Sequence, residues 1–296
     1  MPEASSPEIP YKDLTGHVRK ISDLYFAYGT FSEVYKGSYQ DARSQRAVAI
    51  KVLRGMRISS DLESAILQRL NGEARVWHAL KHSNVLEFLG IARGLGSSVA
   101  LVSPYCANGN ITDYLDDCPE ANRLRLVLDV ARGLQYLHGK DVIHANINGR
   151  NILVADDGRA VLCDYGRSKI INHGGFTAGS IRYMAPELIL KRGEMPETVD
   201  GKDDDFNASE LLSKESDVYA FSMVGVEILS GEHPYRKISS ESAIPDQVSK
   251  GLRPKKEEYR LSKQHESIWD ILELCWVQDP TQRPTISSVV QRLSRL

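Results

Sequence analysis

The segment VIHANINGRNIL, residues 142–153, carries polar side chains whose types and spacing could do chemistry. His144 is followed by Asn146, then by Asn148, and Asn151 lies seven residues after the histidine. Polar side chains at this spacing could bind and orient a hydroxyl group, and a base at position 146 would be needed to take its proton. An amide oxygen can accept a hydrogen bond from a hydroxyl group but has no useful basicity. The loop therefore predicts that orientation of a hydroxyl survives where base catalysis does not.

A glycine-containing segment near the N-terminus is the second candidate for chemistry. In AYGTFSEV, residues 27–34, Gly29 lies between the small residues Ala27 and Ser32. Glycine has no Cβ, so the backbone amides of such a loop can come close to a phosphate group. Taken alone, the segment fits an ordinary β-turn equally well.

The elements that position these residues begin with a predicted sheet. DLYFAYGTFSEVYKGSY and RAVAIKVL are rich in aromatic and β-branched residues of near-alternating polarity, which indicates a hairpin and a third strand. Apolar residues recur at helical spacing from Leu62 to Lys81. Two more strands are expected in VLEFLGIA and VALVSPY.

After Gly109 the pattern becomes mainly helical. Helices are expected in ITDYLDDC, ANRLRLVLDVARGLQYLHGK, ESDVYAFSMVGVEILSG and ESIWDILELCWVQ, with a last helix running to the C-terminus. Two short apolar runs around Asp157 and Gly158 predict a hairpin with a type I′ turn. The acidic segment 191–213 is expected to be a long surface loop.

Composition predicts a globular protein of two lobes. The chain has 296 residues, of which 42% are hydrophobic, and 37 Lys and Arg against 39 Asp and Glu, so no nucleic-acid footprint is expected. The first residues lack a secretory signal and no apolar run is long enough to cross a bilayer, so we expect no membrane partner and a cytoplasmic protein. The four cysteines are scattered without C-x-x-C spacing, which argues against disulfides and zinc.

Taken together, the motifs have the order and rough spacing of those in protein kinases, from about Ile21 to Leu296. AYGTFSEV stands where the family has G-x-G-x-x-G-x-V, and VAIK, DYG and APE follow in order. The chain therefore resembles a protein kinase domain, most closely one of the tyrosine-kinase-like branch. The resemblance implies an α+β, bilobal fold with a small N-lobe of antiparallel sheet plus one helix and a larger, mainly helical C-lobe.

The resemblance also implies domain boundaries and a contact with nucleotide phosphates. We expect an N-terminal tail at 1–20, an N-lobe at 21–103, and the hinge and C-lobe at 104–296. Lys51 of VAIK would contact the phosphates of ATP and pair with Glu73, which explains a lysine on an apolar strand. The alternative is that the two residues are unrelated on the surface.

The remaining nucleotide and metal positions follow from the same resemblance. Asn151 and Asp164 would hold Mg²⁺, and backbone groups of Tyr105 and Cys106 would bind the adenine edge. The positions implied for nucleotide binding are Ala27, Gly29, Ser32, Val34, Ala49, Lys51, Ser103, Tyr105, Cys106 and Leu153.

Seven further residues match structural positions of the family. Trp77, Phe88, His144 and Tyr165 match an internal hydrophobic column. Glu187 and Arg283 match a buried salt bridge, and Asp217 matches the aspartate that holds the catalytic loop.

The catalytic loop itself departs from the family pattern H-R-D-L-K-x-x-N. Ala145 stands for the arginine, Asn146 for the catalytic aspartate and Asn148 for the lysine that contacts the γ-phosphate. We therefore expect a pseudokinase that binds ATP and acts through a nucleotide-stabilised interaction with an unidentified protein. Two alternatives stay open: an active or weakly active kinase, Ser/Thr-directed because of Ser180 in GSIRYMAPE, and an interaction scaffold that no longer binds nucleotide.

Overall fold

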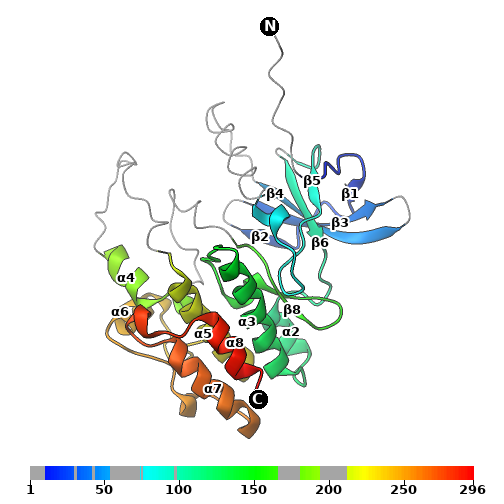
Figure 1. Cartoon of the computed structure of the whole chain (residues 1–296). Helices are drawn as coiled ribbons and strands as arrows, with labels where there is room; N and C mark the ends of the chain where they lie inside the picture. The colour runs from blue at the N-terminus through cyan, green and yellow to red at the C-terminus, as the bar shows by residue number, and fades with distance from the viewer. Residues whose placement is uncertain are drawn as a thin grey trace. The chain divides into compact units, whose positions relative to one another are not determined.

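The computed structural model describes residues 11–29, 32–41, 44–53, 74, 76–96, 99–165, 181–193 and 212–296. The chain divides into two compact units, residues 1–106 and 107–296, whose elements are labelled in Figure 1. Each unit is described by itself. The division falls three residues after the predicted end of the N-lobe at 103.

The first unit is built on an antiparallel sheet. Its strands run in the order β1-β3-β4-β6-β5, and β2 pairs with the first residues of β3. The predicted hairpin and third strand are confirmed as β2, β3 and β4. The strands are β1 (Val18–Lys20), β2 (Ala27–Gly29), β3 (Ser32–Gln40), β4 (Gln45–Leu53), β5 (Gly90–Ala92) and β6 (Ala100–Pro104).

Alternating burial along β4 separates the two faces of this sheet. Val48, Ile50 and Val52 are buried, whereas Ala49 and Lys51 between them are half-buried. Successive side chains of a strand point to opposite faces, so Ala49 and Lys51 face away from the core of the unit. That core comprises Leu14, Val18, Tyr35, Tyr39, Val48, Ile50, Val52, Leu89, Ala92, Ala100 and Val102.

The predicted tail at residues 1–20 is wrong for its second half. Val18 begins β1, which pairs with β3, and Asp13 forms a bridge with Ile91 beside β5. Leu14 and Val18 are buried in the core. Burial of these apolar side chains offsets the entropy of ordering the stretch, so residues 11–20 are part of the first unit.

The helix predicted from Leu62 to Lys81 falls partly within the described residues. Residues 74 and 76–79 are helical. The Trp77 ring stacks on Phe88 with centroids 5.0 Å apart, and its indole N–H donates to the Leu86 carbonyl at 2.6 Å. The end of this helix is therefore docked within the first unit by an aromatic pair and a buried hydrogen bond.

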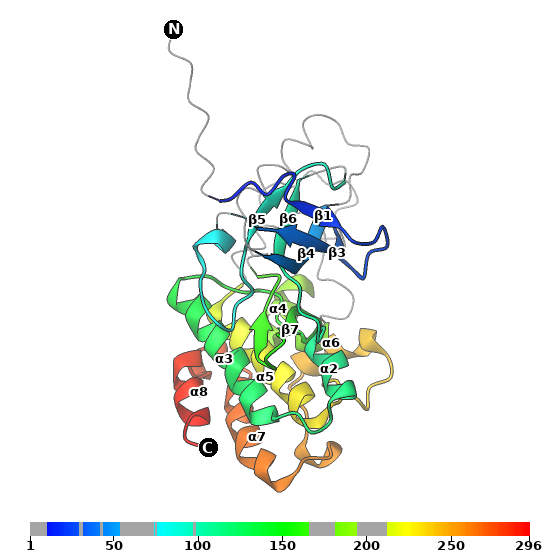
Figure 2. The same cartoon turned by 90° about the vertical axis from the view of Figure 1, so that its right-hand side faces the viewer.

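The second unit is mainly helical, as predicted, and α5 is its central helix (Figure 2). Its side chains from Ser216 to Leu229 are all buried, which is typical of an interior helix, and it packs against α3 and α7. Ser213 caps its start in a capping box, and Gly231, at φ 74°, ends it. The helices are α2 (Ile111–Asp117), α3 (Arg123–Gly139), α4 (Pro186–Gly193), α5 (Lys214–Ser230), α6 (Ile244–Ser249), α7 (Lys263–Cys275) and α8 (Ile286–Leu293).

Three predicted details of this unit differ in the structure. The last helix ends at Leu293 rather than at the C-terminus. The predicted acidic loop 191–213 begins inside α4, and its residues 194–211 lie outside the described residues. Helices α4 and α6 add to those that the sequence predicted. The six residues of α6 are too few to give a clear periodic signal.

The hairpin of the second unit is confirmed, but its predicted type I′ turn is wrong. Strands β7 (Ile152–Val154) and β8 (Ala160–Leu162) pair antiparallel. Gly158, at φ 79°, donates to the Ala155 carbonyl, but Asp157 is not among the residues with positive φ. A type I′ turn needs positive φ at both central residues, so this is a three-residue connection with glycine in the left-handed position.

Candidate functional site

Predicted nucleotide positions of the first unit share the sheet face opposite the core. The register pairs Val34 with Lys51, and Ala49 with Ser103. Cross-strand partners project to the same face. Ala27 joins this face because it pairs with Val34. The fold therefore brings these predicted residues together on one surface of the first unit.

The glycine-containing segment 27–34 forms β2 and the first residues of β3 in this sheet. Gly29 pairs with Ser32, and residues 30 and 31 between them lie outside the described residues. Lys51 is half-buried on β4, and it lies on this same face of the sheet because it pairs with Val34. Glu73 lies outside the described residues, so the pairing of Lys51 with Glu73 stays a prediction.

The hinge contains an aromatic contact that the sequence reasoning missed. The ring of Phe26 meets Tyr105 edge to face with centroids 5.4 Å apart, and the Lys36 ammonium lies 4.3 Å from the centre of the Tyr105 ring. The position of Phe26, directly before Ala27, was the available signal. The Tyr105 amide donates to the Ala47 carbonyl at 3.3 Å, so the backbone contribution of Tyr105 to an adenine edge is limited to its carbonyl oxygen.

In the second unit, Asp217 holds the backbone of the catalytic loop. Its carboxylate accepts the amides of His144 at 2.7 Å and Ala145 at 2.8 Å, and it lies 2.9 Å from Nε2 of His138. Asp217 is buried in the first turn of α5. Ala145 has a φ of 65°, an uncommon conformation for a residue other than glycine. The predicted role of Asp217 as an anchor is thus seen in its contacts.

A chain of amides runs through the loop that Asp217 anchors. The Asn148 side chain donates to the carbonyl of Asn146 at 3.0 Å and to its Oδ1 at 3.3 Å. Nδ2 of Asn146 lies 3.5 Å from Oδ2 of Asp164. The Asn146 oxygen that was expected to orient a hydroxyl is therefore turned toward Asn148.

The two predicted metal residues both contact Asn146. Nδ2 of Asn151 donates to the Asn146 carbonyl at 2.8 Å, which leaves the Asn151 side-chain oxygen as its possible metal ligand. An amide oxygen and the Asp164 carboxylate are the ligand types that suit Mg²⁺, with phosphates and water completing the shell. Within the described ranges, no cluster of three His, Cys, Asp or Glu side chains could hold a metal. The residues present therefore fit a cation shared with nucleotide phosphates.

Aromatic residues pack beneath the loop in the second unit. His144 is fully buried and meets the Tyr165 ring edge to face at 6.1 Å. Burial lowers the pKa of His144, so the imidazole is neutral. This pair and the Trp77–Phe88 pair each lie within one unit. Leu153, half-buried on β7, is the adenine-pocket residue predicted for the second unit.

Glu227 on α5 forms a second polar centre that the sequence reasoning missed. Its carboxylate accepts from Thr112 at 2.8 Å and Tyr183 at 2.6 Å, and it pairs with His233 at 3.2 Å. A Cβ on Gly149 would lie 2.7 Å from this carboxylate. Burial would raise the pKa of Glu227, but the hydrogen bonds outweigh it and the pKa is lowered. The Glu227 carboxylate in turn raises the pKa of His233.

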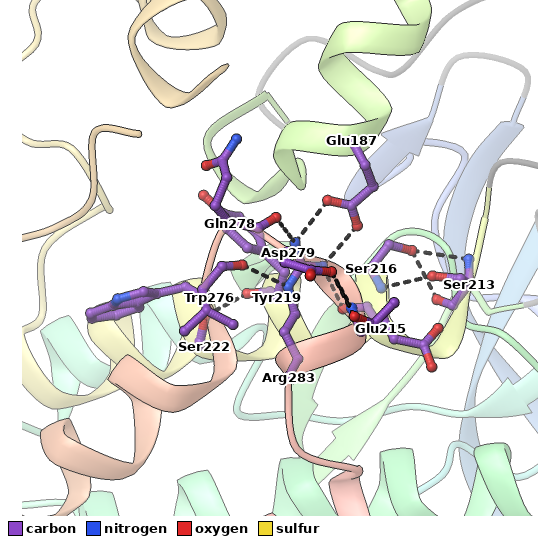
Figure 3. A network of polar contacts seen from close by, with 12 residues as sticks. Glu187, Ser213, Glu215, Ser216, Tyr219, Ser222, Trp276, Gln278, Asp279 and Arg283 are labelled. Carbon is purple, nitrogen blue, oxygen red and sulfur yellow. Dashed lines mark hydrogen bonds and ion pairs between the residues drawn. The ribbon is translucent and has the colours of Figure 1, made fainter. Parts of the chain in front are cut away.

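The predicted salt bridge between Glu187 and Arg283 is present (Figure 3). Arg283 donates to both carboxylate oxygens of Glu187 at 2.7 and 2.8 Å. Its other N–H groups donate to the carbonyls of Val277, Glu215 and Gln278. The buried guanidinium is thus fully hydrogen-bonded, as a buried charge requires.

Ser180 and Gly166 lie outside the described residues. In the part of the chain that the structure describes, none of the helices is both long and apolar enough to cross a membrane.

Comparison with known proteins agrees with this geometry. A sequence model of the protein tyrosine and serine/threonine kinase family matches residues 23–293. Serine/threonine-protein kinase STY17 of Arabidopsis thaliana is 29% identical over 278 residues, which are 91% of this chain and 43% of that protein. Serine/threonine/tyrosine-protein kinase HT1 of the same plant is 27% identical over 278 residues, 91% of this chain and 64% of that protein.

A human protein is similar to this chain over a comparable length. Serine/threonine-protein kinase TNNI3K is 28% identical over 276 residues, which are 90% of this chain and 30% of that protein. The chain thus spans less than two thirds of the length of each of these relatives. The family match covers both units and the motifs in each. The chain therefore belongs to the protein tyrosine and serine/threonine kinase family, in its tyrosine-kinase-like branch.

Proposed function

We propose that this chain is a protein kinase domain that binds ATP with Mg²⁺, is catalytically impaired, and acts through a protein interaction that nucleotide stabilises. One observation carries the proposal: position 146, where the family has its base, is an asparagine whose side-chain oxygen faces Asn148. An amide cannot take a proton from a hydroxyl group at neutral pH. Asn148 also lacks the charge of the lysine that it replaces.

The expected loss of rate is large. General acid-base catalysis contributes roughly 10²- to 10⁴-fold, or about 3 to 5 kcal/mol of barrier. A kinase turning over at roughly 1 to 100 s⁻¹ would fall to about 10⁻⁴ to 1 s⁻¹ from that loss alone. Replacing the lysine by Asn148 removes further stabilisation of the transferring phosphoryl group.

Support for nucleotide binding comes from both units. Val34, Ala49 and Lys51 share the face of the first sheet that lies opposite its core, and Asn151 and Asp164 present oxygen ligands in the second unit. When bound, Mg²⁺ would neutralise phosphate charge. The chain's own contribution is to bind and orient the nucleotide. An unidentified protein would bind the conformation that the nucleotide stabilises. We place this activity in the cytoplasm.

The second candidate is a weakly active Ser/Thr kinase. Phosphoryl transfer depends strongly on positioning, and Asp217 still anchors the loop through His144 and Ala145. The relatives STY17 and TNNI3K are both named serine/threonine-protein kinases. Slow transfer to serine or threonine is therefore the outcome that this candidate predicts.

A thermal-shift titration of the full chain with ATP, with and without Mg²⁺, tests the binding. A ligand selective for the folded state stabilises it by about 2.7 kcal/mol at one hundred times its Kd. Lys51→Ala should reduce the shift, whereas Lys250→Ala, at an exposed lysine paired with Asp246, should not. Absence of a shift at millimolar ATP would favour the nucleotide-free scaffold.

Radiolabel transfer from ATP to a generic protein substrate is the separate test of catalysis. The proposal expects transfer to be absent or far below ordinary kinase rates. Turnover of several per second would show that Asn146 does not limit the reaction.

A further inference from the structure

Exposed apolar side chains gather in residues 21–28 of the first unit. In the described part of the chain eight large hydrophobic side chains are exposed, and five of them lie in this segment. They are Ile21 at 60%, Leu24 at 80%, Tyr25 at 47%, Phe26 at 54% and Tyr28 at 73%. Single exposed apolar side chains are ordinary on a protein surface, whereas a cluster of them marks an interaction site. We call these five residues the apolar strip.

Contacts with β3 fix the apolar strip to the sheet. Tyr25 meets Tyr28 edge to face with ring centroids 6.0 Å apart, and it meets the buried Tyr35 of β3 with centroids 6.4 Å apart. At one end of the strip, the backbone N–H of Ile21 donates to the Lys36 carbonyl of β3 at 2.9 Å. At the other end, Tyr28 lies in β2, which pairs with the first residues of β3. The strip is therefore a surface built on the sheet.

The apolar strip runs into an edge strand. Among the described strands β2 pairs with β3 alone, so β2 forms an edge of the sheet. Edge strands of natural proteins are commonly protected from other chains by charged side chains, proline or a bulge. Residues 24–29, LYFAYG, contain neither a charged residue nor a proline. This edge therefore lacks the usual sequence features that keep a second chain away.

The charged residues next to the apolar strip favour a second copy of this chain as the partner. Lys20 directly precedes the strip, Asp23 lies within the segment, Glu33 pairs with Tyr28 in the sheet register, and Lys36 is hydrogen-bonded to its first residue. A strongly acidic protein, a nucleic acid or an anionic membrane would repel the two carboxylates, and a strongly basic protein would repel the two lysines. A two-fold interface brings the same balanced set of charges from both sides, so opposite charges can meet.

The area of the apolar strip is sufficient for a weak dimer. An aromatic side chain buries roughly 150–250 Å² when it is fully removed from water, so the five partly exposed side chains offer roughly 600 Å² per copy. Two copies would then bury about 1,200 Å² in total, which is the lower limit for specific, stable protein–protein interfaces. We therefore expect association at micromolar rather than nanomolar protein concentration.

We propose that the apolar strip is the interface of a symmetric homodimer, in which the strips of two copies pack against each other across a two-fold axis. This inference goes beyond the proposed function and does not depend on the binding of ATP, so it is tested without nucleotide. None of the five strip residues is a predicted nucleotide position. Substitutions in the strip therefore leave those positions unchanged.

Analytical ultracentrifugation of the full chain over a range of protein concentrations measures the association. The wild-type chain should change from monomer to dimer as its concentration rises through the micromolar range. Leu24→Ser removes an exposed leucine from both halves of the interface, so the dissociation constant of the dimer should rise at least about tenfold. Leu274→Ser, at an exposed leucine of α7 in the second unit, should leave it unchanged. A wild-type chain that stays monomeric at high micromolar concentration overturns the proposal, whatever else covers the strip.

Hydrogen exchange of the wild-type chain locates the contact without any substitution. The backbone amides of residues 21–28 should exchange more slowly at a concentration where the dimer forms than at one where the chain is monomeric. A dimer that protects another segment instead, or one whose dissociation constant is the same in wild type and Leu24→Ser, overturns the apolar strip as the interface. Circular dichroism of Leu24→Ser and Leu274→Ser checks that both variants are folded.

Discussion

The carboxylate of Asp217 accepts the backbone amide of Ala145 at 2.8 Å, and Ala145 has a φ of 65°. A left-handed residue other than glycine costs roughly 1–2 kcal/mol. The hydrogen bond from α5 offsets this cost and fixes the direction in which the loop continues toward Asn146. The hydrogen bond to Asp217 and the left-handed backbone of Ala145 therefore act together to position the loop.

Replacing Asp217 by asparagine should destabilise the second unit strongly. The amide keeps the shape of the side chain but accepts hydrogen bonds at one end only, so the backbone N–H of either His144 or Ala145 loses its acceptor. We expect the free energy of unfolding to fall by about 2 to 5 kcal/mol, measured by urea denaturation. Asp246→Asn, at an exposed aspartate, should change it by less than about 0.5 kcal/mol. Equal effects would mean that the anchor is not needed.

Gly149→Ala should destabilise the loop from its other side. The added Cβ would lie 2.5 Å from Oγ1 of Thr112 and 2.7 Å from the Glu227 carboxylate. These side chains are hydrogen-bonded to each other, so neither can yield freely. We expect a loss of about 1 to 3 kcal/mol in unfolding free energy.

Gly139→Ala is the matched control for this substitution. Gly139 ends α3 and nothing lies within 4 Å of the added Cβ. Alanine is favoured over glycine in a helix by roughly 0.5–1 kcal/mol, so this variant should be neutral or slightly stabilised. A Gly149→Ala variant that behaves like Gly139→Ala would contradict the close packing against Glu227.

Local patterns predicted most of the fold. Alternation predicted β3 and β4, and apolar periodicity predicted α3, because each is long enough to show its own period. For α5, which is buried on all sides from Ser216 to Leu229, the length of the apolar run favoured a helix over a strand. Tyr11, Leu14 and Val18 form too short a run to show one, so their place in the first unit was missed. The hairpin turn was misjudged because the dipeptide at 157–158 suits both a two-residue turn and a bulged turn.

Some residues of the candidate site were also predicted from the sequence, and others were not. Asp217 and Arg283 were found from motifs, since each sits in a recognisable sequence context. Glu227 was not, because its partners Thr112 and Tyr183 are 115 and 44 residues away in the sequence. The direction of the Asn146 amide was also out of reach, because it depends on a hydrogen bond to Asn148 that only the folded loop creates.

The pairing of His233 with Glu227 should make stability depend on pH. The carboxylate raises the pKa of His233, so its stabilising contribution is full below the ordinary imidazole pKa of about 6.5 and is lost as pH rises through the raised value. The His233 side chain is 57% exposed, which limits the effect to less than about 1 kcal/mol. Urea denaturation between pH 6 and 9 measures it.

Two variants isolate this contribution. His233→Gln should flatten the dependence on the alkaline side, whereas His17→Gln, at an exposed histidine, should leave it unchanged. At low pH the Glu227 contribution is lost as the pH falls through its lowered pKa. Parallel curves for wild type and His233→Gln would exclude the pair as the source.

Breaking the salt bridge between Arg283 and Glu187 should be costly because the guanidinium is buried. Arg283→Met removes a guanidinium whose N–H groups all have acceptors. It also leaves both oxygens of the Glu187 carboxylate without their Arg283 donors. We expect a loss of about 3 to 5 kcal/mol, by urea denaturation. Arg236→Met, at a half-exposed i,i+4 pair with Glu232, should cost no more than about 1 kcal/mol. Similar losses would show that burial of Arg283 contributes little.

Restoring an aspartate at position 146 and a lysine at position 148 together should raise any residual phosphoryl transfer. In Asn146→Asp with Asn148→Lys, position 146 regains a group that can take a proton and position 148 regains a positive charge. A gain within the roughly 10²- to 10⁴-fold range of acid-base catalysis is expected, measured by radiolabel transfer. The gain should disappear when Asp164→Asn is added, since phosphate positioning would then fail. No gain in the double variant, with nucleotide binding retained, would mean that the impairment lies elsewhere than in the two asparagines.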